Sequence, residues 1–232
     1  FNDKTWGGWE DSRYNSVTHT HAHFAAMITR LDQYVGEIFD KLREKELDKN
    51  TIVFFTSDNG PHEEGGADPE FFGRDGKLKG LKRQCYEGGI RIPFIAWWPG
   101  HIKASSVNDT PFAFYDIMPT FCDLAGIKQF AKRYINKRLP GDALDGISIA
   151  PTLLGNNAAQ KHRDYLYWEF HETDQIGVRM GNWKLVLFNL VTDLHEDHDV
   201  ASSHPDILSK MLEVIKKEHT PSADFVVTLP SY

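Results

Sequence analysis

Apolar residues in the first quarter of the chain recur at steps of three and four. This pattern runs through Phe24, Met27, Ile28, Leu31, Val35, Ile38 and Leu42. Charged residues occupy the opposite face, so residues 24–47 are predicted to form an amphipathic helix with Thr20 as its N-cap. A turn then leads into residues 52–55, an aromatic and β-branched run that predicts a buried strand. A helix followed by a buried strand is half of a βαβ repeat.

Turn-forming residues follow the predicted strand abruptly, in the order Ser57, Asp58, Asn59, Gly60 and Pro61. The chain therefore leaves the carboxyl end of the strand with a carboxylate and a carboxamide, and His62 comes just beyond them. Ligands of open α/β sheets bind at that edge. Asp58 and Asn59 offer the hard oxygen ligands that Ca²⁺ or Mg²⁺ prefers, although the same residues also make an ordinary turn.

A long stretch without periodicity, residues 59–85, carries several glycines and basic residues, including Lys82. Loops of this length are usually functional or disordered. The composition favours backbone shaped around an anion, and a mobile surface loop is the alternative. Beyond it, Glu87 and Arg91 are predicted to form an internal ion pair beside a position that only glycine can occupy. A second strand is expected at residues 90–98, with Pro93 at an edge, at the strand start or in a bulge.

The hydrophobic period changes again in the second half of the chain. A helix is predicted at residues 115–125, with Pro119 in its first turn and Gly126 as its stop. Residues 127–163, which include a basic stretch, form a passage between domains. Alternation at residues 165–171 and 184–190, around a turn at 180–182, predicts a small antiparallel sheet. A last helix begins at residues 203–206, which resemble a capping box, and the tail from Thr220 is expected to dock back.

Composition excludes several classes of protein. The chain has 232 residues and a net charge of -7, which argues against a nucleic-acid partner because phosphate binding requires clustered Lys and Arg. No apolar run is long enough to span a membrane, and no secretory signal opens the sequence. Cys85 and Cys122 form no disulfide framework. The alternating His19, His21 and His23 could bind zinc in principle, but the pattern favours polar residues around a helix start.

The joint spacing of these segments points to a family. SDNGPH, a glycine-rich loop, Lys82 five residues before YEGGIRIP, then WWPG and YDIMPTFCDLAG resemble the type I, formylglycine-dependent sulfatases of the alkaline phosphatase superfamily. DGISIAPTLLG and the closing VRMGNWKLVLFNLVTDLHEDHDVASSHPDI extend the resemblance over most of the chain. It implies an α/β fold: residues 1–155 as the C-terminal part of the doubly wound catalytic domain, and residues 156–232 as a small subdomain of antiparallel sheet plus helix.

The resemblance also implies roles for individual residues. Asp58 and Asn59 would be two ligands of the active-site cation, calcium rather than magnesium. Lys82 would be catalytic and contact the sulfate near its bridging oxygen, and His62 would be a substrate contact or proton donor, with a structural role as the alternative. A sulfate ester is a diffuse anion, and its cleavage adds charge to the departing oxygen. An ammonium group at that oxygen stabilises the developing charge.

One departure from the family pattern is serious. Neither Cys85 nor Cys122 lies in the Cys/Ser-x-Pro-x-Arg motif that yields the formylglycine nucleophile. The nucleophile and the remaining metal ligands are expected upstream, in a missing N-terminal half of the same protein. The parent is thus expected to be a sulfuric ester hydrolase that acts on a sulfated small molecule or glycan, while this chain alone is inactive. The resemblance implies a periplasmic, secreted or lysosomal location.

Two other functions stay open at this point. A phosphodiesterase or phosphonate hydrolase of the same superfamily would handle a similar tetrahedral anion. A non-catalytic fragment that binds sulfated glycans would keep the loop without turnover.

Overall fold

The computed structural model describes residues 17–73, 76–127, 145–185 and 187–230. Most of the predicted N-terminal loop, the basic stretch at 128–138 and Val186 lie outside the described residues. The chain divides into two compact units. Unit 1 comprises Phe1–Asp48, Phe55–Phe94 and Tyr167–Tyr232, and unit 2 comprises Lys49–Phe54 and Ile95–Leu166. The predicted domain boundary between residues 155 and 156 stays a prediction.

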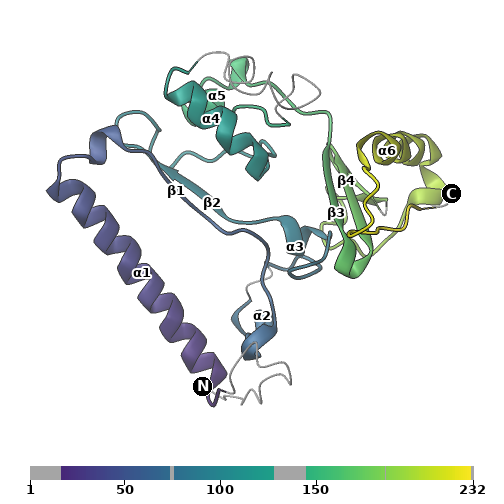
Figure 1. Ribbon diagram of the computed structural model, residues 1–232, viewed down its shortest axis with the longest axis horizontal. Coiled ribbons are helices and arrows are strands. Elements are labelled where there is room, and N and C mark those ends of the chain that lie inside the picture. Colours follow the sequence, from purple (N-terminus) through teal and green to yellow (C-terminus); the bar gives the residue numbers. More distant parts are fainter. Residues whose placement is uncertain (1–16, 74–75, 128–144, 186, 231–232) are drawn as a thin grey trace. The chain divides into compact units, whose positions relative to one another are not determined.

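Short helices and strands follow one long helix along the chain (Figure 1). The helices are α1 (Thr20–Glu44), α2 (Pro69–Phe72), α3 (Glu87–Ile90), α4 (Ile117–Leu124), α5 (Ala150–Leu153) and α6 (Pro205–Glu218). The strands are β1 (Val53–Thr56), β2 (Phe94–Trp97), β3 (Leu166–Phe170), β4 (Gln175–Met180), β5 (Trp183–Lys184) and β6 (Phe188–Asn189). β1 pairs with β2, and the other four strands form a second sheet in the order β3-β4-β5-β6.

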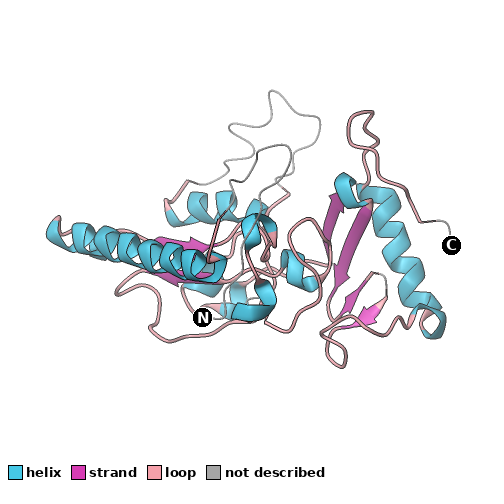
Figure 2. Cartoon of the chain, turned by 90° about the horizontal axis from the view of Figure 1, so that it is seen from below, coloured by secondary structure: helices cyan, strands magenta, loops and turns pink. Residues whose placement is uncertain are grey.

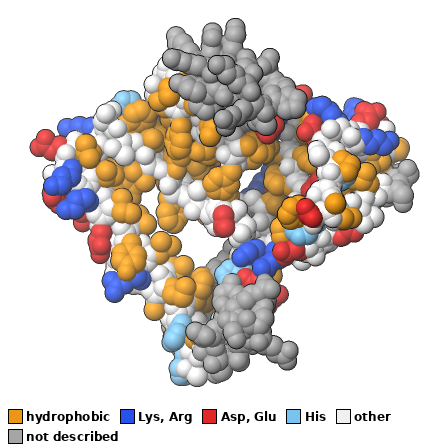
Figure 3. All heavy atoms as spheres, in the orientation of Figure 1, with side chains coloured by type: hydrophobic (Ala, Val, Ile, Leu, Met, Phe, Trp, Pro, Cys, Tyr) orange, Lys and Arg blue, Asp and Glu red, His pale blue; other side chains and the backbone are white. Residues whose placement is uncertain are grey.

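The predicted amphipathic helix is α1, but its N-cap was assigned wrongly. His19 occupies the cap position with a positive φ of 58°, and Thr20 is the first helical residue. The apolar face of α1 is largely exposed: Met27 is 67% and Ile38 is 57% accessible. Figure 3 shows apolar side chains at the surface along this helix. An apolar stripe of this width normally packs against another element.

The second predicted strand was too long. Residues 87–90 form the short helix α3, and only Phe94–Trp97 is β2. Pro93 lies just before the strand, where its missing N–H interrupts no ladder, and its carbonyl accepts a 2.8 Å hydrogen bond from Thr56 Oγ1. The helical turn forms because the amide of Arg91 donates to the carbonyl of Glu87 at 2.7 Å.

The C-terminal sheet confirms the predicted antiparallel subdomain but corrects its strands. Residues 184–190 were expected to be one strand; instead β5 and β6 pair antiparallel, with Lys184 opposite Phe188. β4, which was not predicted, pairs antiparallel with β5 around the turn at Gly181. Helix α6 lies along this sheet (Figure 2) and buries Met211, Val214 and Ile215. The expected capping box is absent from α6, because the His204 cap makes no side-chain hydrogen bond.

Unit 2 is organised around a buried carboxylate, Asp116, which is 2% exposed. Its oxygens accept hydrogen bonds from the amides of Ala113 at 2.8 Å and Ile147 at 2.6 Å, and it pairs with Arg163. The predicted helix follows as α4, with Pro119 in its first turn and Gly126 at a φ of 69° beyond its end. Both details match the sequence prediction.

The C-terminal tail docks at more than one residue, and the ring of Phe225 lies 4.9 Å from that of His171. The Thr228 amide donates to Asp174 Oδ1 at 2.6 Å and Val227 is 8% exposed, whereas Val226 stays 68% exposed. Among the described residues, no helix is both long and apolar enough to cross a membrane.

Candidate functional site

The turn that follows β1 holds its shape through its own polar groups. Ser57 Oγ donates to the carbonyl of Asn59 at 2.9 Å, and Asn59 Nδ2 donates to the carbonyl of Gly60 at 2.9 Å. The Asp58 side chain is exposed at the end of the strand. In the described part of the chain, no hydrogen-bond donor reaches its carboxylate. The turn therefore presents a free carboxylate and leaves the carboxamide oxygen of Asn59 available.

Backbone hydrogen bonds join this turn to the segment that carries Lys82. The amide of Gly60 donates to the carbonyl of Gly89 at 2.8 Å, and the amide of Lys82 donates to the carbonyl of Pro61 at 2.8 Å. The approach leaves no room for a side chain, because a Cβ on Gly60 would lie 1.8 Å from the carbonyl oxygen of Gly88. Residues 58–62 and 82–89 thus form one closely packed wall.

A carboxylate that sequence reasoning missed, Glu64, brings two predicted site residues together. Its side chain is 5% exposed, and its Oε2 lies 3.6 Å from Lys82 Nζ and 3.7 Å from His62 Nδ1. Its other oxygen accepts from Arg83. A buried carboxylate requires paired cations, and here these include the predicted catalytic lysine. The signal was present in the acidic pair that precedes Gly65, yet only the fold shows which glutamate is buried.

Arg83 is held from both sides. Besides Glu64, its Nε lies 3.0 Å from Glu172 Oε2, and its carbonyl accepts from Thr173 Oγ1 at 2.7 Å. The hydrogen bond that Arg83 donates to Glu64 raises the pKa of the guanidinium. Its backbone φ of 76° is unusual for a residue with a side chain. These contacts fix the backbone next to Lys82, whose ammonium stays partly accessible with a 32% exposed side chain.

That the glycine-rich loop is shaped around an anion stays a prediction, and the structure describes its glycine backbone and one of its lysines. Gly65, Gly66, Gly73, Gly76 and Gly80 all have positive φ, between 58° and 91°. Lys79, however, donates to the carbonyl of Glu196 at 2.8 Å and lies over the ring of Tyr86, so its role is structural. The predicted ion pair of Glu87 with Arg91 is present at 3.1 Å.

The three histidines near the start of α1 do not act together. His21 is buried, with Nε2 3.0 Å from Asp68 Oδ2 and its ring stacked on Phe71 at 3.8 Å. Within the described ranges, no cluster of His, Cys, Asp and Glu has the make-up of a metal site. The expectation of polar residues around a helix start fits, but the carboxylate partner of His21 lies 47 residues away and was not foreseen.

Two family models match the chain in overlapping halves. The sulfatase model matches residues 3–127, and the model of the N-sulphoglucosamine sulphohydrolase C-terminal region matches residues 80–221. The chain belongs to the sulfatase family.

Named relatives agree with this assignment. A sulfatase described as N-acetylgalactosamine-6-sulfatase from Mus musculus is 31% identical, over 80% of this chain and 33% of its own length. The N-acetylgalactosamine-6-O-sulfatase of Bacteroides thetaiotaomicron is 30% identical, over 82% of this chain and 41% of its own. The structure of Ps i-CgsB in complex with k-i-k-neocarrahexaose superposes with a TM-score of 0.69 at 30% identity, over 84% of this chain and 42% of that one. This sulfatase chain therefore spans about a third to two fifths of the curated relatives' length.

The turn after β1 suits part of the cation site that a sulfatase implies. Asp58 offers an exposed carboxylate. The amide nitrogen of Asn59 donates to the carbonyl of Gly60, so the amide oxygen is left to bind a cation. Calcium takes about six to eight oxygen ligands. The two residues fit the chemistry of the site but not its full number of ligands.

Cys85 of this sulfatase chain does not have the setting of a nucleophile. Cys85 is buried, and burial raises the pKa of its thiol, although Lys184 opposes the shift. Its amide donates to Gln175 Oε1 at 2.7 Å. A thiol with a raised pKa is rarely the reactive thiolate, so Cys85 is a core residue.

Proposed function

We propose that the protein to which this chain belongs is a sulfuric ester hydrolase that removes sulfate from a sulfated carbohydrate. The observation that carries the proposal is membership of the sulfatase family over both halves of the chain. The carbohydrate substrate is supported by relatives named for N-acetylgalactosamine 6-sulfate chemistry and by a structural relative solved with a neocarrahexaose.

Within this proposal, Lys82 contacts the sulfate near its bridging oxygen. Its partly exposed ammonium beside Glu64 supports the role, since a lysine held at one carboxylate has fixed geometry and free donors left for an anion. His62, 35% exposed on the same carboxylate, is proposed as a substrate contact. The charge that develops on the departing oxygen is stabilised by such pre-positioned donors.

Asp58 and Asn59 are proposed as two ligands of a divalent cation, calcium in preference to magnesium. The donor chemistry of the turn supports this assignment. When bound, the cation would neutralise charge on the non-bridging sulfate oxygens. The turn itself holds the two ligands in place, because the amide of Gly60 donates a hydrogen bond to the carbonyl of Gly89.

We further propose that the rest of the parent protein supplies the formylglycine and the other cation ligands, and covers the exposed apolar face of this chain. Two observations support the proposal. The chain spans 33% to 41% of the relatives' lengths, and Met27, Ile28, Leu31 and Ile38 of α1 expose a contiguous apolar stripe. Ile95 of β2 is also 60% exposed. The isolated chain is then expected to be inactive and to bind calcium weakly. A periplasmic, secreted or lysosomal location belongs to the same proposal.

The experiment uses the full-length protein and N-acetylgalactosamine 6-sulfate oligosaccharides, with released sulfate measured by ion chromatography. Lys82→Ala is expected to lower kcat by roughly a hundredfold or more, because a donor to the developing charge is lost. The matched control is Lys216→Ala, an exposed lysine of α6. A normal kcat for Lys82→Ala would mean that another lysine contacts the sulfate.

A second variant separates the cation site from the lysine. Asp58→Ala is expected to remove bound calcium, measured by elemental analysis, together with activity, while Asp123→Ala at an exposed site of α4 changes neither. Normal calcium content in Asp58→Ala would reject Asp58 as a ligand.

A further inference from the structure

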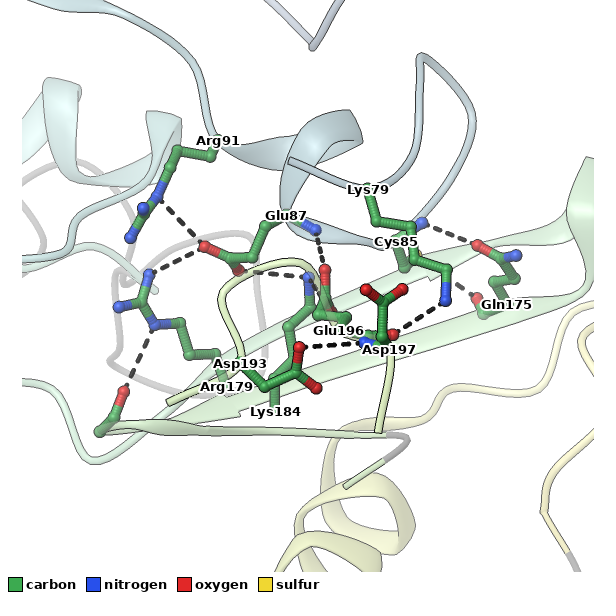
Figure 4. Close-up of polar contacts among 11 residues, drawn as sticks. Lys79, Cys85, Glu87, Arg91, Gln175, Arg179, Lys184, Asp193, Glu196 and Asp197 are labelled. Carbon is green, nitrogen blue, oxygen red and sulfur yellow. Dashed lines mark hydrogen bonds and ion pairs between the residues drawn. The ribbon is translucent and has the colours of Figure 1, made fainter. Parts of the chain in front are cut away.

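A cluster of buried charges joins Glu87, five residues after Lys82, to the C-terminal sheet and the loop that follows it (Figure 4). Its centre is Lys184 of β5, whose side chain is 0% exposed. Lys184 Nζ lies 3.2 Å from Glu87 Oε1 and 3.2 Å from Glu196 Oε1, and these two glutamates are 1% and 0% exposed. Glu87 Oε2 also faces Arg91 Nε at 3.1 Å and an Arg179 nitrogen at 3.5 Å. Three cations therefore share two buried carboxylates; Lys184 is itself fully buried, whereas the side chain of Arg179 is 18% exposed and that of Arg91 is 42% exposed.

The cluster bonds to backbone as well as to side chains. Glu196 Oε2 accepts from the amide of Glu87 at 2.6 Å, and the carbonyl of Glu196 accepts from Lys79 Nζ at 2.8 Å. A third contact comes from β4, where Gln175 Oε1 accepts from the amide of Cys85 at 2.7 Å. The C-terminal sheet and the loop after it thus hold the chain on both sides of Lys82, at positions 79, 85 and 87.

Close glycine packing makes this attachment stiff. A Cβ on Gly88 would lie 2.3 Å from the carbonyl oxygen of Gly80, and one on Gly89 would lie 2.0 Å from that of Gln84. Gly89 in turn accepts from the amide of Gly60, and Lys82 donates to the carbonyl of Pro61. Because these backbone segments are in close contact, a shift of Glu87 is expected to shift Lys82 and the turn after β1 as well.

Stability alone does not account for so many buried charges. Burying an ion pair costs desolvation, and apolar residues of similar volume often stabilise a fold as well or better. What charges add is directional geometry, because each hydrogen bond fixes an orientation as well as a distance. Two contacts of the cluster are of that kind: Lys184 Nζ donates to Glu87 Oε1, and the amide of Glu87 donates to Glu196 Oε2.

We propose that Lys184 is a positioning residue for the sulfatase site: through Glu87 and Glu196 it fixes the segment 79–91 so that the Lys82 ammonium is held at the departing oxygen of the substrate. The inference rests on the proposed role of Lys82, since Lys184 itself lies in the core and touches no substrate. It assigns to the C-terminal sheet a part in turnover beyond its part in folding.

The test is a double-mutant cycle in the full-length protein with N-acetylgalactosamine 6-sulfate oligosaccharides. Lys184→Met is expected to lower kcat roughly tenfold to a hundredfold, the range for small displacements of a catalytic group, with KM changed less than about threefold. In a Lys82→Ala background the same substitution is expected to leave the residual kcat unchanged. Equal losses in both backgrounds would show that Lys184 acts on folding alone and would overturn the proposal.

Because Lys184→Met unpairs two glutamates, a milder variant is included. Glu196→Gln keeps an oxygen that can accept from the amide of Glu87 and removes the negative charge that Glu196 places beside Lys184. It is expected to lower kcat several-fold when Lys82 is present and to leave the residual kcat unchanged in a Lys82→Ala background. Lys216→Met on the exposed face of α6 is the control. Unchanged kcat in a folded Glu196→Gln protein, together with additive losses in Lys184→Met, would contradict the proposal.

Hydrogen exchange gives a readout that does not depend on activity. Peptides covering residues 79–91 are expected to exchange at least about tenfold faster in Lys184→Met, while peptides of α4 are unchanged. Unchanged exchange in residues 79–91 overturns the positioning role. Faster exchange with no effect of Lys82→Ala on kcat would instead retain the positioning role and reject the proposed function of Lys82.

Discussion

Each compact unit contains a buried centre of carboxylates, and the two centres pair these charges with different kinds of partner. Asp116 in unit 2 and the Lys184 cluster in unit 1 both hold carboxylates that are at most 2% exposed. Asp116 is satisfied by two backbone amides and one cation, all within 47 residues along the chain. Glu87 depends on Lys184 across 97 residues of the chain and on Glu196 across 109. The first centre closes a local loop, whereas the second joins the site segment to a distant sheet.

This difference predicts unequal costs when the cation is removed. Without its cation, Asp116 still accepts hydrogen bonds from two backbone amides. Without Lys184, Glu87 and Glu196 lose the ammonium group that both of them contact.

The largest effect is expected for Lys184→Met. Two buried carboxylates would lose their shared cation, and breaking a buried ion pair costs about 3 to 5 kcal/mol. Burial already raises the pKa of Glu196, with Lys184 opposing the rise, so the variant should bind a proton there more readily. Denaturant unfolding of the full-length protein measures the loss, with Lys216→Met as control. A loss below about 1 kcal/mol would show that Arg91 and Arg179 suffice for the cluster.

A smaller effect is expected for Arg163→Met, the equivalent change at Asp116. The carboxylate keeps its hydrogen bonds from Ala113 and Ile147, and Arg163 is 18% exposed, so water screens part of the pair. The expected loss is about 1 to 3 kcal/mol, that of a hydrogen bond to a charged group. The same unfolding measurement applies, with the exposed Lys161→Met as the matched control. A loss as large as that of Lys184→Met would remove the distinction between the two centres.

The smallest effect is expected at an exposed carboxylate, Asp174. The hydrogen bond from the Thr228 amide lowers the pKa of Asp174, so its contribution is present above the usual pKa and is lost as the pH falls through the lowered one. Acidification, or Asp174→Asn at neutral pH, should release the tail locally without global unfolding. Hydrogen exchange of a peptide containing Thr228 measures it, with Asp224→Asn as control. Exchange that is independent of both changes would contradict tail docking through Asp174.

Much of the local structure followed from the sequence. The helix α1, the strand β1, the stop at Gly126 and the helix α6 all come from hydrophobic period or turn chemistry, which act over a few residues. The wrongly predicted strands lie where tertiary contacts outweigh the hydrophobic pattern of the sequence. The β5–β6 hairpin replaced the single predicted strand, and Lys184 at its start pairs with a buried carboxylate, which alternation of apolar and polar residues does not predict.

The candidate site divides in the same way. Asp58, Asn59, His62 and Lys82 could be named from motif spacing, and their roles remain proposals. Glu64 could not be named, because the sequence carries adjacent acidic residues at 63 and 64 and only the fold buries one of them against Lys82 and Arg83.

By itself, then, the sequence determined the family, the order of the main elements and the chemical character of the turn after β1. These depend on residue types at fixed short spacing, and that information is local. The folded chain alone shows that Lys184 pairs with Glu87 and Glu196, and that Glu64 lies between Lys82 and His62. The physical reason is that burial sets the cost of a charge, and burial is decided by segments about a hundred residues apart in the chain that pack together.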